Sequence, residues 1–358
     1  CRELPCALYL EGEAPTKSKE ENKEILKEHH LLLVIMNGSQ KRYEQIDGIE
    51  RGKMEQIELD GITFRLKTWC DFSWLRSYGT AFRVIDATGS GCLCIGMQKG
   101  SQRYFLKIAG ADTIYAEVPP DESIRVLKNA AGLYQELAHP NLIHLIEHFP
   151  HENLYVAVFD WVEGECLFDF WNFEKYTQNK QLIRPSDRFH TLSARKKLQC
   201  AEVLFSFLEK TAEKGYVAVD FYDGSIMYDF NTDQTMICDI DFFRKMPAYN
   251  NMGEKLFGTK RLKSPEEYIL GAKLDEKTNV FTLGALLFDF FGEFSSSDIA
   301  ERYMKNAFSP CDRGKWELNT ACYEAAGKAV SAERNSRYRT IREFHLVWEK
   351  AVDSDTDI

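Results

Sequence analysis

The spacing of the apolar residues changes part-way along the chain, and this change limits the folds that the chain can adopt. Before residue 110, short apolar segments are separated by turn signals such as Asp60-Gly61 and Lys99-Gly100. This pattern is typical of β-strands that are joined by tight turns. The sequence therefore predicts an antiparallel sheet that includes residues 56–59, 62–66, 81–85, 92–97 and 104–108.

Helical spacing dominates the rest of the chain. Asp121 is the expected N-cap of a helix in which apolar residues recur at helical intervals up to Leu137. A strand is expected at 155–159, a long amphipathic helix at 193–214, strands within 216–243 and mainly helices over 265–352. A β-rich portion followed by an α-rich portion predicts an α+β protein with a cleft between two lobes.

Charge and hydropathy narrow the classes of partner. The 358 residues carry 45 basic and 55 acidic side chains, a net charge of −10. Sequence-independent binding to the phosphates of a nucleic acid needs an excess of basic residues instead. The longest apolar stretch, residues 31–36, is far shorter than the ~20 residues that span a bilayer. The ten cysteines are scattered without metal-binding spacing. We therefore expect a cytoplasmic protein that binds neither nucleic acid nor a membrane.

A glycine turn and a lysine are the first features that indicate chemistry. Gly89 and Gly91 flank Ser90, and such a turn lets backbone N–H groups approach phosphate oxygens, although a plain hairpin turn has the same sequence. Lys107 follows within an apolar strand. An ammonium group there needs an anionic partner or a route to water, and an edge strand would also provide that route.

Two later segments end in carboxylates. Asp220 follows an apolar strand, and Ser225 lies five positions further on. In phosphoryl transfer, an aspartate so placed accepts the proton of the attacking hydroxyl, and the second residue helps to hold a metal ion. Asp239 and Asp241 end another apolar strand and share one face of it. Carboxylate oxygens suit Mg²⁺, although turn capping by Asp220 and ion pairing of Asp239 or Asp241 with Arg244 or Lys245 are structural alternatives.

In their order and spacing, these segments resemble the protein kinase superfamily over roughly residues 80–350. Further matches are His139-Pro140-Asn141-Leu142, Gly258-Thr259, Ser264-Pro265-Glu266, residues 279–284, where Asn279 stands in place of the family's aspartate, and Arg337 at the place where the family keeps an arginine that would pair with Glu266. The spacing from Gly258-Thr259 to Glu266 makes the chain more similar to eukaryotic-like Ser/Thr kinases than to small-molecule kinases.

The resemblance implies a role for each motif residue. Gly89, Ser90 and Gly91 would form the glycine-rich loop, and Lys107 would pair with the phosphates of ATP. The backbone at Asp160 and Val162 would bind adenine. Asp220 would be the catalytic aspartate, and Asp241 with Ser225 would hold Mg²⁺. Asp241 is preferred to Asp239 because Ile240-Asp241-Phe242 looks like the start of the family's metal-binding triplet. Asp239 gives the more usual loop length, and both could line the metal site.

The same resemblance implies a bilobal protein-kinase-like fold. Residues 1–78 would be an N-terminal extension, 79–162 a lobe with an antiparallel sheet and one helix, 163–352 a mainly helical lobe, and 353–358 a tail. Aromatic residues such as Trp74 and Tyr78 lie just before the first kinase-like strand. We expect them to brace the first lobe, and the alternative is a docking surface for a regulatory partner.

Several positions depart from the family's pattern. Val219, Tyr222, Ser225 and Phe243 replace an arginine, a lysine, an asparagine and a glycine, and the position of the helix glutamate falls on Ala130. We therefore expect a divergent Ser/Thr kinase that uses Mg-ATP to phosphorylate a protein hydroxyl. Two alternatives remain: a pseudokinase that binds nucleotide or serves as a scaffold, and a small-molecule kinase. Residues 220–225 resemble the catalytic loop of small-molecule kinases as closely as that of protein kinases.

Overall fold

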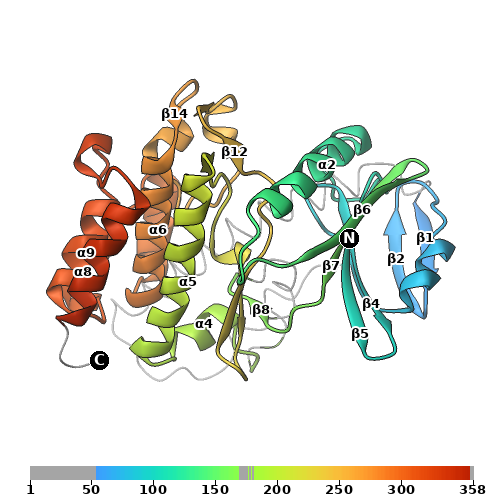
Figure 1. The fold of residues 1–358 in the computed structure, drawn as a ribbon, viewed down its shortest axis with the longest axis horizontal. Helices are drawn as coiled ribbons and strands as arrows, with labels where there is room; N and C mark the ends of the chain where they lie inside the picture. The colour runs from blue at the N-terminus through green and yellow to red at the C-terminus, as the bar shows by residue number, and fades with distance from the viewer. Residues whose placement is uncertain (1–53, 169–175, 177–178, 180, 355–358) are drawn as a thin grey trace, which may run out of the picture.

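The computed structural model describes residues 54–168, 176, 179 and 181–354. A five-stranded antiparallel sheet forms one side of the molecule, with the strand order β3-β4-β5-β7-β6 (Figure 1). Its strands are β3 (Thr80–Ile85), β4 (Cys92–Lys99), β5 (Gln102–Ala109), β6 (Leu145–His151) and β7 (Leu154–Asp160). The expected strands within this sheet are confirmed, and β6 is an additional one, but the strands expected at 56–59 and 62–66 form a separate two-stranded sheet.

The segment before the sheet packs against it. Hairpin β1 (Glu55–Leu59) and β2 (Ile62–Leu66) and the short helix η2 (Ser73–Tyr78) contribute Phe64, Leu66 and Leu75 to a core that also contains Leu106 and Ile108 of β5. The ring of Trp74 packs at a tilt against that of His151, with the ring centres 4.4 Å apart. The packing role expected of the aromatic residues in 71–79 is confirmed, and residues 1–53 lie outside the described part of the chain.

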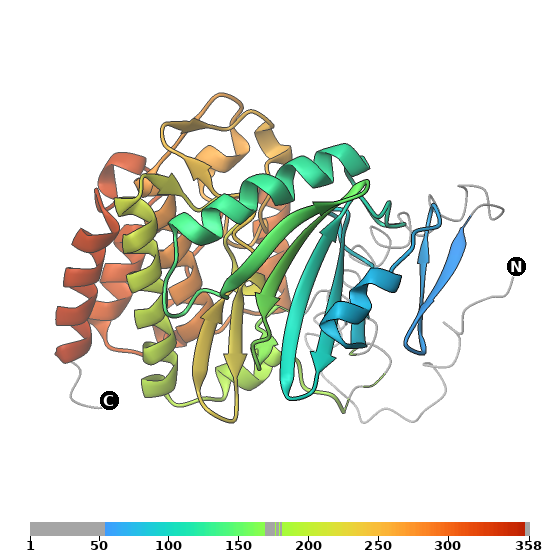
Figure 2. The same ribbon diagram turned by 45° about the vertical axis from the view of Figure 1, so that its right-hand side comes forward.

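Helix α2 (Pro120–Glu136) covers the other face of the sheet (Figure 2). Its buried residues Leu127, Ala130 and Tyr134 belong to the same core as Ala157 and Phe159 of β7. The N-cap is Pro119 rather than the expected Asp121, which lies in the first turn instead. A proline at the first helical position fits because that residue's N–H has no intrahelical partner.

The remainder is mainly helical. The long helix expected at 193–214 is α5 (Ala194–Glu213), and it lies beside α6 (Glu276–Phe291) and α9 (Ile341–Asp353), against both of which α8 (Thr320–Ala329) packs (Figure 1). Short elements connect them: β8 (Glu165–Cys166), α4 (Pro185–His190), β9 (Tyr216–Val217), η4 (Asp223–Ser225), β10 (Ile226–Asp229), β11 (Gln234–Ile237), β12 (Arg244–Lys245), β13 (Ala248–Tyr249), η5 (Gly253–Lys255), η6 (Pro265–Tyr268), β14 (Lys273–Leu274), α7 (Ser296–Lys305), η7 (Arg313–Lys315) and η8 (Arg334–Ser336). The fold is thus a mixed one with antiparallel sheets and several helices, compatible with the predicted α+β class. No helix among the described residues is both long and apolar enough to cross a bilayer.

A buried ion pair joins η6 to the segment before α9. The guanidinium of Arg337 donates to both carboxylate oxygens of Glu266, at 2.7 and 3.0 Å, and both residues are buried. The hydroxyl of Thr278 on α6 donates to the same carboxylate at 3.0 Å. The pairing predicted for Glu266 and Arg337 is confirmed, and it fixes η6 on the helical part.

His345 joins α9 to α5 through both of its ring nitrogens. Nδ1 lies 2.9 Å from Glu209, Nε2 lies 2.9 Å from Glu202 and 4.0 Å from Glu349, and the ring stacks on Phe205. Burial lowers the pKa of His345, but the hydrogen bonds and negative charges of Glu202 and Glu209 raise it further, to about 9. The ring is therefore an imidazolium at neutral pH.

This cluster predicts a pH-dependent contribution to stability. Because the folded-state pKa of about 9 exceeds the unfolded value of about 6.5, the stabilisation is fully present below pH 6.5 and is lost as the pH rises through 9. Replacing His345 by Gln is expected to lower the free energy of unfolding by about 1 kcal/mol near pH 6. The loss should shrink towards zero near pH 10, as measured by urea titration.

The exposed His190, replaced by Gln, is the control. A His345→Gln difference that stays constant from pH 6 to pH 10 would contradict the assignment of an imidazolium.

Candidate functional site

Lys107 lies on the central strand of the five-stranded sheet. In the antiparallel register of β5, it pairs with Cys94 of β4 and Ala157 of β7, and only 8% of the residue is exposed. Its side chain points to the face that α2 covers. The interpretation as an edge-strand lysine is therefore wrong, and the ammonium group needs anionic partners inside the molecule.

Two carboxylates provide these partners. Lys107 Nζ donates to Asp239 Oδ1 at 2.6 Å and to Asp241 Oδ2 at 2.9 Å. Burial alone would lower the pKa of Lys107, but the charges of the two aspartates raise it well above its usual value. The lysine is thus held as an ammonium ion by a segment more than a hundred residues away in the sequence.

The two aspartates have different environments. The Asp241 side chain is 4% exposed, whereas that of Asp239 is 40% exposed. The second oxygen of Asp241 accepts a hydrogen bond from the Tyr134 hydroxyl at 2.9 Å. Burial raises the pKa of Asp241, and Lys107 opposes this effect. Of the two, Asp239 is the carboxylate that an incoming ligand can reach.

Asp220 follows β9, and Asp239 lies close enough for its negative charge to affect the pKa of Asp220. Burial raises the pKa of Asp220 well above its usual value, the negative charges of Asp239 and Glu267 add to the rise, and the nearby Lys263 opposes it. Asp220 has a positive φ of 64°. The backbone just before it is fixed by Asn279 of α6, which accepts a hydrogen bond from Ala218 N at 2.8 Å.

A cavity of about 10 Å³ lies beside Asp220 and is also lined by Thr259, Lys263 and Glu267. This volume is roughly that of one water molecule. The Lys263 ammonium group donates to the Leu256 carbonyl, so its charge is fixed inside the structure.

Ser225 ends η4 and is completely buried. Its carbonyl accepts from Cys238 N at 2.9 Å, which places it next to the residue before Asp239. Its hydroxyl has no hydrogen-bond partner within the described residues, which is costly for a buried polar atom. A hydroxyl oxygen without a partner is a hard donor of the kind that binds Mg²⁺, although in this structure it is closed off from solvent.

The glycine turn precedes β4 and lies against the segment that leads into α2. The Gly89 carbonyl accepts a hydrogen bond from Glu117 N at 2.9 Å. Gly91 has a φ of 74°, and a Cβ there would approach Ser123 and Ala116 to 3.3 Å, so only glycine fits without a shift. Within the described chain, the N–H groups of Gly89 and Ser90 donate no hydrogen bond to a backbone carbonyl, and the Glu117 side chain lies against Gly89.

Asp160 and Val162 lie where the sheet passes into the helical part. Asp160 ends β7, its N–H donates to the His144 carbonyl at 3.0 Å, and its carboxylate lies 2.8 Å from the same residue's Nδ1. Its N–H is therefore already occupied. The N–H and carbonyl of Val162 take part in no hydrogen bond among the residues that the structure describes. Of the two residues, Val162 is the one with backbone groups free for a base.

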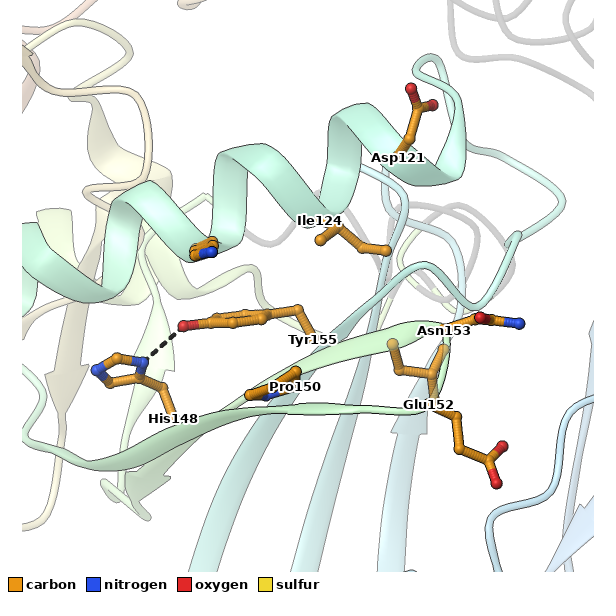
Figure 3. A pocket seen from close by; sticks show the side chains of 9 residues that line it. Asp121, Ile124, His148, Pro150, Glu152, Asn153 and Tyr155 are labelled. Carbon is orange, nitrogen blue, oxygen red and sulfur yellow. Dashed lines mark hydrogen bonds between the residues drawn. The ribbon is translucent and has the colours of Figure 1, made fainter.

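A separate cavity of about 530 Å³ lies elsewhere, between α2 and the β6–β7 hairpin (Figure 3). Ile124, His148 and Tyr155 line it, and the Tyr155 hydroxyl lies 2.7 Å from His148 Nδ1. It contains none of the residues predicted for the site. Over the described ranges, the one group of three possible metal-binding side chains is Glu202, His345 and Glu349, where the histidine nitrogens already bond to glutamates.

No role in the site was predicted for Tyr134, Lys263 or Asn279. Tyr134 fits the apolar spacing of α2 and was therefore expected only in the core, although a buried tyrosine hydroxyl usually needs a partner. Asn279 stands where the resemblance places an aspartate, and this match could have pointed to it. No feature of the sequence pointed to Lys263.

The chain matches no family model and no curated protein. Its function is therefore argued from the geometry of the residues described above.

Proposed function

We propose that the chain is a divergent serine/threonine protein kinase, which transfers the γ-phosphoryl group of Mg-ATP to a protein hydroxyl. The observation that carries this proposal is the convergence of Lys107, Asp239 and Asp220 from three distant segments. A buried ammonium group beside a reachable carboxylate, with a further carboxylate of raised pKa close by, is a charge arrangement that phosphoryl transfer can use.

The architecture supports a bilobal protein-kinase-like fold within the eukaryotic-like family. The five-stranded sheet with α2 precedes the helical part in the expected order. Asn279 holds the backbone before Asp220, and the Glu266–Arg337 pair fixes η6. We further propose that the protein works in the cytoplasm, since all the cysteines in the described part of the chain are free thiols.

The nucleotide would be held by one lysine side chain and by backbone groups. Lys107 would exchange its contact with Asp239 for phosphate oxygens, and the N–H groups of Gly89 and Ser90 would approach the same anion. The free backbone groups of Val162 would hold the adenine edge.

Asp239, with Ser225 behind it, is the pair that would hold a magnesium ion. Such an ion would neutralise phosphate charge as the γ-phosphoryl group leaves. Asp220 would orient the substrate hydroxyl and accept its proton, and its raised pKa brings it nearer to the range in which a general base is effective.

The first test is binding. Mg-ATP at a hundredfold excess over its dissociation constant is expected to stabilise the protein by about 2.7 kcal/mol, seen as a higher Tm. Asp239→Asn should remove the Mg²⁺-dependent part of the shift, because it removes the exposed carboxylate. Lys107→Ala should remove the shift altogether. Thermal unfolding is measured with ATP in the presence of either Mg²⁺ or EDTA.

Asp121→Asn, an exposed carboxylate in the first turn of α2, is the matched control and should leave the shift unchanged. A Mg²⁺-dependent shift that persists in Asp239→Asn but disappears in Asp241→Asn would move the metal to Asp241. No shift in the unmodified protein would contradict nucleotide binding.

The second test is transfer. With γ-labelled ATP and a protein lysate, label is expected on polypeptide, and Asp220→Asn should lower the rate by about 10²–10⁴-fold while the thermal shift remains. Label found only in the small-molecule fraction would replace the protein substrate by a small one. Binding without any transfer would leave a pseudokinase.

The buried position of Ser225 also favours this second candidate, a nucleotide-binding pseudokinase. The ring of Tyr222 lies so close to Gly224 that a Cβ there would meet it at 2.5 Å. Ser225 itself is fully buried behind this turn. A tightly packed turn at the place of a second metal ligand would allow nucleotide binding through Lys107 and Asp239 while slowing transfer.

A further inference from the structure

Helix α2 offers Lys107 no glutamate partner. Ala130, the position expected for it, is completely buried. Glu122 pairs with Arg125 on the same helix, and Glu136 accepts hydrogen bonds from Tyr216 and Lys245. The helix must therefore be linked to the lysine by another residue, or not at all.

Tyr134 makes this link through Asp241. Its hydroxyl donates to Asp241 Oδ1 at 2.9 Å and accepts from Ile240 N at 3.3 Å. The other oxygen of Asp241 accepts from Lys107 Nζ at 2.9 Å. One carboxylate thus bridges a helix residue and a strand residue, and the hydroxyl both donates and accepts.

The surroundings fix the hydroxyl in this place. Tyr134 is 3% exposed, and its ring packs edge-on against Phe159 of β7 at 4.8 Å. Burial and the charge of Asp241 raise the pKa of Tyr134 well above its usual value, so the hydroxyl keeps its proton and donates at every physiological pH. A donor that cannot ionise is suited to holding a carboxylate.

We propose that Tyr134 is a positioning residue that orients Lys107 for the nucleotide through Asp241, in place of a helix glutamate. This inference rests on the proposed function for its catalytic consequence. Asp241 is then a structural bridge that stays on the lysine, whereas Asp239 yields its contact to the nucleotide. The position of α2 controls the lysine, because any shift of the helix moves the hydroxyl away from Asp241.

The test compares Tyr134→Phe with Tyr155→Phe in the full chain. Tyr155 is the matched control because its hydroxyl bonds to His148 on the side of α2 that faces the separate cavity (Figure 3). The first readout needs no activity: the rate at which an amine-reactive acetyl ester modifies Lys107, followed by mass spectrometry. The ester reacts only with the neutral amine, so Lys107 must first leave Asp241 and release a proton to solvent. With Asp241 no longer held by the Tyr134 hydroxyl, this opening should be more frequent and speed the modification by about tenfold in Tyr134→Phe, with no change in Tyr155→Phe.

The second readout is kinetic. Tyr134→Phe is expected to lower kcat by about tenfold with little change in the KM for Mg-ATP, because a misoriented lysine costs more in the transition state than in binding. Equal modification rates in both variants and the unmodified protein would overturn the proposal. A raised rate specific to Tyr134→Phe in a protein that binds no Mg-ATP would refute the proposed function while leaving the Tyr134–Asp241–Lys107 link intact. Circular dichroism of each variant shows that it is folded.

Discussion

The neutralisation of one buried lysine governs the arrangement of the candidate site. An ammonium group inside a protein is costly unless it is paired and hydrogen-bonded. Lys107 lies on a central strand, where it is buried away from solvating water. Asp239 and Asp241 supply the charges, so the segment between β11 and β12 must lie against the sheet. Tyr134 then ties the same segment to α2. A single charge thus fixes the relative positions of a strand, a helix and a loop.

The helical part holds the other half of the site by different means. Asn279 of the nearly wholly buried α6 satisfies backbone groups on both sides of Val217, accepting from Ala218 N and donating to the Tyr216 carbonyl. The backbone leading to Asp220 is therefore anchored to a buried helix of the core. Burial raises the pKa of Asp220, and the negative charge of nearby Asp239 adds to the rise. The proposed kinase chemistry depends on these two anchors, one electrostatic and one made of backbone hydrogen bonds.

Local patterns predicted the strands before residue 110, α5 and the Glu266–Arg337 pair, because spacing and motif order are properties of the sequence itself. Strand β6 was missed because its sequence Leu-Ile-Glu-His-Phe-Pro-His has no regular alternation. The motif favoured Asp241 over Asp239 as the metal ligand, whereas the structure leaves Asp239 the more exposed of the two, and side-chain exposure cannot be read from a motif. The bilobal kinase fold and the roles of all the predicted site residues remain predictions.

The measurement that tests the central claim most directly is a crystal structure with Mn²⁺ in place of Mg²⁺ and a non-hydrolysable ATP analogue. The account predicts an anomalous peak about 2 Å from an Asp239 oxygen, the distance typical of such a cation. It also predicts that Lys107 contacts phosphate oxygens while still paired with Asp241. A peak on Asp241 alone, or a nucleotide that leaves the Lys107–Asp239 contact unbroken, would contradict it.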